Sequence, residues 1–222
     1  MLYDYAHHTP TRLLQESGKV YPFIAQCHQQ IWACYQLLCD CFAQGGKLMV
    51  AGNGGSASDS AHIVGELMKG FMSRRPMTMQ QQALFNLLGK DGQRMAATLQ
   101  RTLPAIALTE QSALLSAFAN DVAPDLVFAQ QVFGYAQPHD IFLGLSTSGN
   151  SSNVLMAAKA AKAMKIKAIG ITGAAPNGLC EVCDVCVALP CSGTPQIQEA
   201  TLPTYHLLCM MLEKHFFDEE AL

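Results

Sequence analysis

The chain has 222 residues, of which 50% are hydrophobic and 14% are charged, so it is neither disordered nor fibrous. Its net charge of −3 excludes the basic surface typical of nucleic-acid-binding proteins. No apolar stretch reaches the ~20 residues that cross a bilayer, the N-terminus has no secretory-signal pattern, and the nine cysteines lack the spacing of a secreted disulfide framework. We therefore expect a cytoplasmic protein that binds neither nucleic acid nor membrane.

Helical and extended patterns alternate along the chain. In chain order they predict a helix at 20–44, a strand at 47–51, a helix at 57–69, two short helices within 77–100 separated at Gly89–Gly92, a strand at 105–108, a helix at 112–119, a strand at 141–145, a helix at 154–164, strands at 167–171 and 185–189, and a helix at 198–217. Such alternation favours the α/β class, with a five-stranded parallel sheet that is doubly wound, with helices on both faces. We expect one domain over 1–222, with N-terminal helices in 1–45.

Residues 77–100 admit two interpretations. They form either a solvated helical hairpin or a lid that reshapes the mouth of a pocket, since they follow directly from the predicted helix at 57–69.

Two loops at the carboxyl ends of predicted strands have the composition of a phosphate site. The first contains Asn53, Gly54, Gly55 and Ser56, and its glycines allow a ligand to approach the backbone at a helix N-terminus. The second contains a hydroxyl-rich run, with Ser146, Thr147, Ser148 and Ser151. Both could also be ordinary strand-to-helix turns with capping side chains. Neither has the Walker ending or the spacing of a dinucleotide fingerprint, so we expect no nucleotide cofactor.

Two pairs of polar residues lie on predicted helices. His62 and Glu66 are four residues apart and share one helix face, where they could bind a divalent metal or act in proton transfer. Gln198 and His206 are eight residues apart, which on a straight helix separates them by ~12 Å and ~80°. Pro203 lies between them and predicts a kink or a new helix start, so Gln198 sits on a differently directed segment or the site draws on two chains.

Together these loops and pairs resemble a SIS (sugar isomerase) domain, and more narrowly the phosphoheptose isomerase branch (GmhA), to which DiaA is related. The resemblance covers residues 20–76 and 101–217. It implies that Glu66 and His206 are the acid/base pair of an aldose–ketose isomerase. It also implies a zinc site of His62, Glu66, Gln198 and His206 in some members, substrate contacts from both loops, Gln198 and Asp121, and a homotetramer.

The sequence departs from the family pattern after Glu66. Members usually carry an arginine four residues after this glutamate. This chain has Gly70 at that position, and Lys69 directly before it. This difference and residues 77–100 leave the identity of the sugar open. The run of Cys180, Cys183 and Cys186 resembles a metal-ligand spacing, but alternation along the predicted strand would point these side chains to different faces.

The leading functional hypothesis is therefore a phosphosugar isomerase that acts through an enediolate, on sedoheptulose 7-phosphate or a related sugar phosphate. The alternative is a non-catalytic SIS protein, either a sugar-phosphate sensor or a DiaA-like protein-binding scaffold. A scaffold has no use for a complete acid/base pair, so the presence of Glu66, His62 and His206 favours the enzyme.

Overall fold

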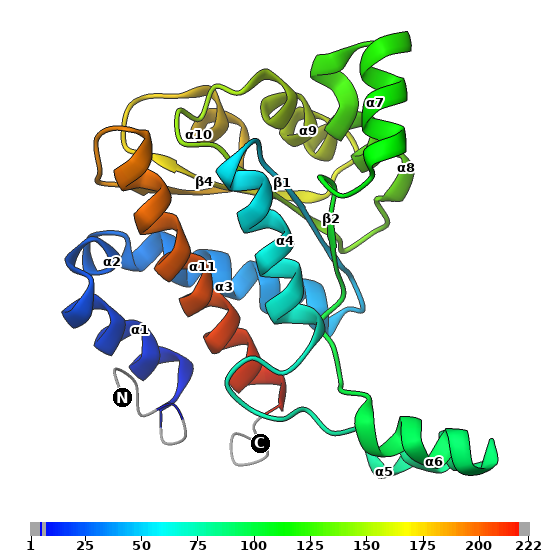
Figure 1. The fold of residues 1–222 in the computed structure, drawn as a ribbon. Helices are drawn as coiled ribbons and strands as arrows, with labels where there is room; N and C mark the ends of the chain where they lie inside the picture. Colours follow the sequence, from blue (N-terminus) through cyan, green and yellow to red (C-terminus); the bar gives the residue numbers. More distant parts are fainter. Residues whose placement is uncertain (1–4, 6–7, 218–222) are drawn as a thin grey trace.

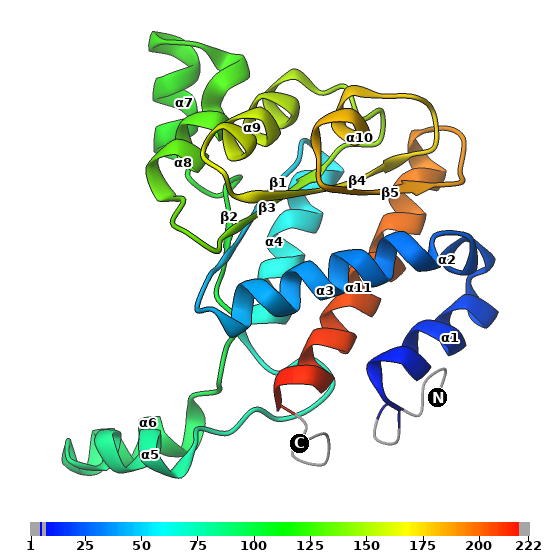
Figure 2. The ribbon, with the colours of Figure 1, turned by 180° about the vertical axis from the view of Figure 1, so that it is seen from behind.

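A computed structural model describes residue 5 and residues 8–217 and contains one five-stranded sheet between two layers of helices (Figures 1 and 2). All strand pairs are parallel, and the strand order is β2-β1-β3-β4-β5. The strands are β1 (Leu48–Ala51), β2 (Ala105–Ala107), β3 (Ile141–Leu145), β4 (Lys167–Gly173) and β5 (Val185–Leu189). The predicted α/β class and five-stranded parallel sheet are confirmed.

Both faces of the sheet are buried, and alternate residues of a strand face different helices. In β1, Leu48 and Val50 belong to the larger apolar core, whereas Met49 and Ala51 belong to the core on the opposite face. The larger core includes residues of α1 (Pro10–Val20), α2 (Pro22–Gln26), α3 (His28–Ala43), α4 (Gly55–Met68) and α11 (Thr194–Phe217). The smaller core includes residues of α8 (Val127–Tyr135), α9 (Ser152–Ala163) and α10 (Gly178–Val182).

The strand order reverses between β1 and β3, which are neighbours in the sheet although β2 separates them in sequence. In sheets with this order, ligands bind beyond the carboxyl ends of the strands at the reversal point. The two candidate phosphate loops follow β1 and β3, so the topology places both of them at that point.

The helices differ from the predictions in four places. The predicted helix at 20–44 is divided at Cys27 into α2 and α3, and α1 precedes it. The separation between the two short helices lies at residues 87–88 and not at Gly89–Gly92, because Gly89 begins the second helix. Helices α8 and α10, and the 3-10 turn η2 (Pro124–Leu126) beside α7 (Ser112–Asp121), were not predicted. Helix α11 runs without interruption through Pro203.

Helices α5 (Met79–Asn86) and α6 (Gly89–Thr98) form a hairpin, here called the arm, that projects from the body (Figures 1 and 2). The two helices approach closely at Gly92, where an added Cβ would lie 1.8 Å from the Phe85 carbonyl oxygen. At the base of the arm, the Arg101 backbone N–H donates to the Arg75 carbonyl at 2.7 Å. The arm carries exposed apolar side chains at Met79, Leu84, Leu87 and Leu88.

Cys180 and Cys186 form a disulfide that joins α10 to β5. This bond removes both sulfurs from the set of possible metal ligands, so the metal-ligand interpretation of the cysteine run is wrong. Among the described residues, no helix is long and apolar enough to span a membrane.

Candidate active site

The two candidate phosphate loops are held together by a pair of side-chain amides. Asn53 in the first loop and Asn153 at the start of α9 exchange hydrogen bonds of 2.8 and 2.9 Å between their amide groups. Because Asn153 directly follows the second loop, this double bond fixes one loop against the other. The structure therefore brings the loop residues that follow β1 and β3 to one place.

The second loop is a tight turn that presents hydroxyl groups. The buried Ser146 hydroxyl accepts from the Gly149 N–H at 3.1 Å and lies 3.0 Å from the Ser151 hydroxyl, while Ser148 is exposed. Gly149 has φ +66°, and a Cβ there would lie 2.1 Å from Asn177, so a glycine is required. Thr147 is half-buried, and its carbonyl accepts from the Gly173 N–H at 3.1 Å.

The first loop is a turn into the N-terminus of α4. Gly54 precedes the helix with φ +55°, Gly55 begins it, and Ser56 is buried in its first turn. An added Cβ on Gly55 would lie 2.8 Å from the side-chain nitrogen of Gln198. The amide of Gln198 on α11 is thus packed directly against this loop.

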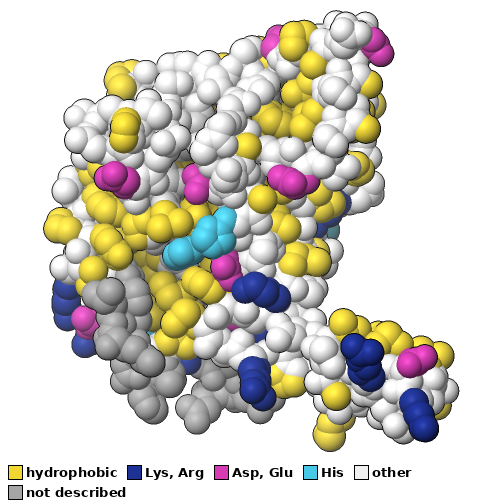
Figure 3. All heavy atoms as spheres, viewed as in Figure 1, with side chains coloured by type: hydrophobic (Ala, Val, Ile, Leu, Met, Phe, Trp, Pro, Cys, Tyr) yellow, Lys and Arg dark blue, Asp and Glu magenta, His cyan; other side chains and the backbone are white. Residues whose placement is uncertain are grey.

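Three of the predicted site residues converge further along α4 and α11. Glu66 Oε1 lies 3.1 Å from His62 Nε2, and His206 Nε2 lies 3.4 Å from the same His62 nitrogen. One ligand atom from each residue lies within 4.8 Å of the other two. Figure 3 shows histidine side chains gathered at the centre of this face, beside acidic and basic side chains and apolar surface.

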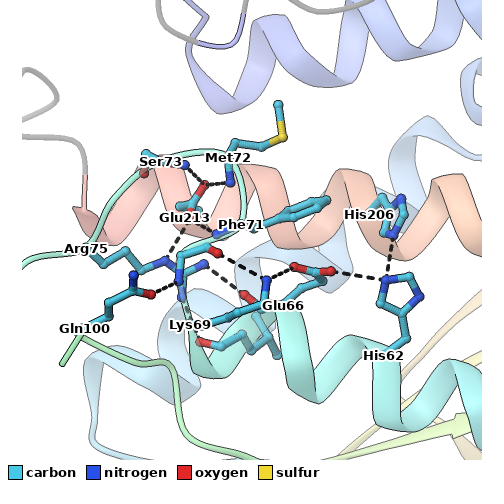
Figure 4. A network of polar contacts seen from close by, with 12 residues as sticks. His62, Glu66, Lys69, Phe71, Met72, Ser73, Arg75, Gln100, His206 and Glu213 are labelled. Carbon is cyan, nitrogen blue, oxygen red and sulfur yellow. Dashed lines mark hydrogen bonds and ion pairs between the residues drawn. The ribbon is translucent and has the colours of Figure 1, made fainter. Parts of the chain in front are cut away.

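Glu66 is buried, and both of its carboxylate oxygens have partners. Oε1 faces His62, and Oε2 accepts a hydrogen bond of 3.0 Å from Lys69 Nζ. Figure 4 shows Lys69 and His62 on opposite sides of the carboxylate. Lys69 therefore supplies a positive charge next to Glu66, although it is one residue closer along the chain than the arginine of the family pattern.

The segment after Glu66 is fixed by a buried ion pair (Figure 4). Arg75 Nε donates to Glu213 Oε1 at 2.8 Å, and both side chains are fully buried. The Arg75 guanidinium also donates to the carbonyl oxygens of Glu66 and Leu67, which lie in the last turn of α4 where carbonyl groups lack partners within the helix. Glu213 in turn accepts from the backbone N–H groups of residues 71–73. This network sets the direction in which the chain leaves the site.

The surroundings of His206 favour its neutral form. Partial burial, followed by the nearby His62, lowers the pKa of His206 below its ordinary value of 6.5. A neutral imidazole at neutral pH can accept a proton from a reacting group, as the acid/base role requires.

The donor set of this cluster fits a zinc ion. Two imidazole nitrogens and one carboxylate oxygen converge, and these are the ligand types that zinc takes in catalytic sites with three protein ligands. The 3.4 Å approach of two imidazole nitrogens also needs a proton or a cation to relieve the repulsion of their lone pairs. The cluster can therefore hold a divalent metal, and it can equally transfer protons.

Two predicted residues lie outside this cluster. Gln198 is on the same unbroken helix as His206, so the prediction that Pro203 redirects this segment is wrong. The apolar packing of α11 against the larger core outweighs the local effect of the proline. Asp121 is exposed at the end of α7, where it accepts from Asn120 at 2.8 Å. Its place near the sugar hydroxyls stays a prediction.

Several residues that shape the site were not predicted from the sequence. Asp59 and Tyr205 hold His62 from behind, Asn153 joins the loops, and Arg75 with Glu213 fixes the end of α4. Only Glu213 had a sequence signal, because it is an isolated acid in the apolar run that ends α11.

Comparisons with known proteins show the family to which the chain is similar. Residues 94–173 match the SIS domain family. The phosphoheptose isomerase of Geotalea daltonii is 36% identical over 190 residues, which cover 86% of each chain. That of Thiobacillus denitrificans is 40% identical over 177 residues, or 78% of this chain and 77% of the relative. Among solved structures, phosphoheptose isomerase GmhA from Neisseria gonorrhoeae superposes with a TM-score of 0.69 at 27% identity, covering 92% of this chain and 93% of that one.

Proposed function

This chain belongs to the phosphoheptose isomerase family, and we propose that it interconverts sedoheptulose 7-phosphate, or a related ketose phosphate, with its aldose isomer through an enediolate. The observation that carries this proposal is the convergence of His62, Glu66 and His206 within 4.8 Å. These residues lie on the two helices that also contact the first loop, through Gly55 and Gln198.

We assign the phosphate of the substrate to the two loops. Asn53, Gly54, Gly55 and Ser56 offer backbone N–H groups at the start of α4, and Ser146, Thr147, Ser148 and Ser151 add hydroxyl groups. His62 lies seven residues along α4 from Gly55, a rise of about 10 Å. This spacing suits an elongated ligand that has its charged group at one end and its reacting carbons at the other. Gln198 and Asp121 are assigned to the sugar hydroxyls.

We assign the proton transfers to Glu66 and His206. In the ketose, Glu66 removes a proton from the carbon next to the carbonyl, and the electron pair moves toward the carbonyl oxygen to give the enediolate. Neutral His206 moves the proton between the two oxygens, and Glu66 returns its proton to the neighbouring carbon. Lys69 holds the Glu66 carboxylate in position through its 3.0 Å hydrogen bond.

His62, Glu66 and His206 are the residues that would hold zinc, whereas Gln198 lies outside this cluster and against the first loop. A bound zinc ion would polarise the substrate carbonyl and stabilise the negative charge of the enediolate.

We also propose that the protein assembles as a homotetramer. Large apolar side chains are exposed on the arm and along α7–α8, where they are Leu114, Val122 and Phe133. Contact between copies of the chain would remove this apolar surface from water. The arm carries Lys90, Asp91 and Arg94, a net positive charge, whereas the acidic residues at 110, 121 and 125 lie in a stretch, residues 102–138, without lysine or arginine. The net charges of the two segments are therefore opposite in sign. The cytoplasmic location stays a prediction from the sequence.

The test is proton exchange with deuterated solvent. The protein is incubated with five- to seven-carbon ketose phosphates, with and without added zinc, and deuterium entry at carbon is followed by NMR. Exchange into sedoheptulose 7-phosphate, with weaker exchange into shorter sugars, is the expected result. Binding of the sugar phosphate without any exchange would instead indicate a sensor or scaffold, and would contradict the enzymatic proposal.

A further inference from the structure

The paired amides of Asn53 and Asn153 join the two loops in a defined orientation. Asn53 Nδ2 donates to Asn153 Oδ1 at 2.8 Å, and Asn153 Nδ2 donates to Asn53 Oδ1 at 2.9 Å. The Val154 N–H donates to the same Asn153 oxygen at 3.0 Å, which fixes the orientation of the Asn153 amide and, through it, that of Asn53. Within the described part of the chain, no other hydrogen bond joins residues 53–56 to residues 146–153.

Each loop is held tightly on its own side of this contact. In the first loop, an added Cβ on Gly52 would lie 2.6 Å from the Ser56 carbonyl oxygen, so the turn closes directly onto the start of α4. In the second loop, the Leu179 N–H of α10 donates to the Gly149 carbonyl at 3.0 Å. The first loop is thus attached to α4 and the second to α10, and the amide pair links the two.

The spacing of the loops matters because neither of them contains a lysine or an arginine. An anion between them is held by N–H and hydroxyl groups and by the positive ends of α4 and α9, which begin at residues 55 and 152. These interactions have a short range, since hydrogen bonds need contacts of ~3 Å and the field of a helix end falls off within the first turn. A phosphate that contacts both loops therefore depends on how closely they are held together.

We propose that Asn153 is a positioning residue, whose paired bonds to Asn53 hold the N-termini of α4 and α9 close enough for one phosphate group of the substrate to contact both loops. The Asn53 side chain acts through the same pair, while the Asn53 backbone faces the ligand. The proposal rests on the phosphate assignment within the proposed function, but the amide pair itself is a property of the protein without ligand.

Two substitutions at position 153 separate positioning from folding. Asn153→Ala removes both bonds between the amides. Asn153→Asp keeps an acceptor for the Val154 N–H and for Asn53 Nδ2, but it places a second carboxylate oxygen against Asn53 Oδ1. Its negative charge lies in the first turn of α9, where it stabilises the helix and repels a bound phosphate. A purely structural residue would lose affinity and stability together, whereas Asn153→Asp should lose affinity alone.

The chain offers a matched control for the loss of an exposed amide. Gln44 is exposed at the end of α3, and its side chain donates to the Asp40 carbonyl at 3.1 Å. Gln44→Ala therefore removes a side-chain amide bond of similar length without touching either loop.

The experiment is a double-mutant cycle on the full-length protein, with inorganic phosphate and sedoheptulose 7-phosphate titrated calorimetrically. Asn53→Ala and Asn153→Ala should each weaken binding roughly 10-fold. The double variant should bind about as well as either single variant, because both remove the same contact. Asn153→Asp should weaken binding by about 100-fold with a urea midpoint close to that of the wild type, and Gln44→Ala should bind as the wild type does. In the isomerase assay, Asn153→Ala should raise KM by the same factor as Kd and leave kcat nearly unchanged.

A second measurement needs no ligand. The Ser56 N–H donates to the Asn53 carbonyl at 3.0 Å, within the first loop. Asn153→Ala should speed hydrogen exchange at Ser56, although residue 153 follows the other loop, and Gln44→Ala should not. Unchanged exchange at Ser56 in Asn153→Ala would contradict the link between the loops.

Two binding results would also overturn the proposal: a wild-type Kd in Asn153→Ala, or a double variant whose loss is the product of the two single losses. A wild type that binds neither ligand would overturn it together with the phosphate assignment of the loops. A wild type that binds both ligands but exchanges no deuterium into carbon would contradict the isomerase alone, and the cycle would still decide the role of Asn153.

Discussion

Arg75 and Glu213 form an ion pair of 2.8 Å in which neither side chain has any exposed surface. The pair lies where the chain leaves α4, and it links the carbonyl oxygens at the end of that helix to α11 through the two side chains. The relative position of α4 and α11 decides whether Glu66 and His206 meet. A buried salt bridge outside the candidate site thus supports the geometry of the candidate catalytic pair.

Breaking this ion pair should cause a large loss of stability. Glu213→Gln leaves the Arg75 charge buried without a counter-charge, which we expect to lower the free energy of unfolding by about 3–5 kcal/mol. Urea denaturation followed by circular dichroism measures the change. The matched control is Glu16→Gln at the exposed ion pair with Arg12, which should leave stability almost unchanged. Equal effects of the two variants would contradict the assigned role of Glu213.

Removing the carboxylate of Glu66 should abolish turnover and spare binding. Glu66→Gln keeps the shape of the side chain but cannot accept the carbon proton, so we expect kcat to fall by about 100-fold or more. Calorimetric titration with the sugar phosphate should give a nearly unchanged Kd, because the proposed phosphate contacts come from the two loops and not from Glu66. Glu181→Gln, at an exposed glutamate of α10, should retain full activity. Retained turnover in Glu66→Gln would exclude this residue as the base.

The lowered pKa of His206 predicts how stability depends on pH. The unfolded chain protonates this residue near pH 6.5, whereas the folded chain protonates it only at lower pH. The unfolded state therefore binds more protons in that window, and the contribution of His206 makes stability fall as the pH drops through 6.5. Urea denaturation at pH 7.5 and 5.5 should show a smaller loss in His206→Gln than in the wild type. A larger loss of stability in His206→Gln than in the wild type would contradict a lowered pKa for His206.

Lys165 should be replaceable by glycine with a gain in stability. It follows α9 with φ +60°, and its N–H and that of Ile166 close the helix by bonding to Lys162 and Ala161, in the pattern that favours glycine at this position. Lys165→Gly should raise the free energy of unfolding by about 1 kcal/mol. Lys162→Gly, three residues earlier inside the helix, should lower it by about 1 kcal/mol. Thermal melts should show a higher melting temperature than the wild type for Lys165→Gly and a lower one for Lys162→Gly.

Polar substitutions on the arm should alter the assembly without unfolding the body. Replacement of Leu84, Leu87 and Leu88 by serine removes exposed apolar surface, so we expect a smaller species in size-exclusion chromatography with light scattering. The control replaces the exposed Gln80 and Gln93 by serine and should leave the molar mass unchanged. An unchanged mass in the leucine variant would show that the arm does not hold copies together.

The sequence by itself determined the sheet, because each strand is a short apolar run between turn residues and all but the strand at 167–171 are followed by a predicted helix. It also located the two loops, since each combines glycine and serine directly after a predicted strand. It further pointed to the pairing of His62 with Glu66, which one helical turn brings together. These features depend on residues close in sequence, where backbone geometry decides the result.

Tertiary structure decided the rest, because it depends on contacts between distant segments. The continuity of α11 through Pro203 follows from its packing against the core and not from local preference. The approach of His206 to His62 follows from the way α4 and α11 pack together. The roles of Tyr205, Asp59, Arg75 and Asn153 follow from partners 100 to 146 residues away, which no local pattern specifies. The meeting of the two loops follows from the strand order, which places β1 beside β3.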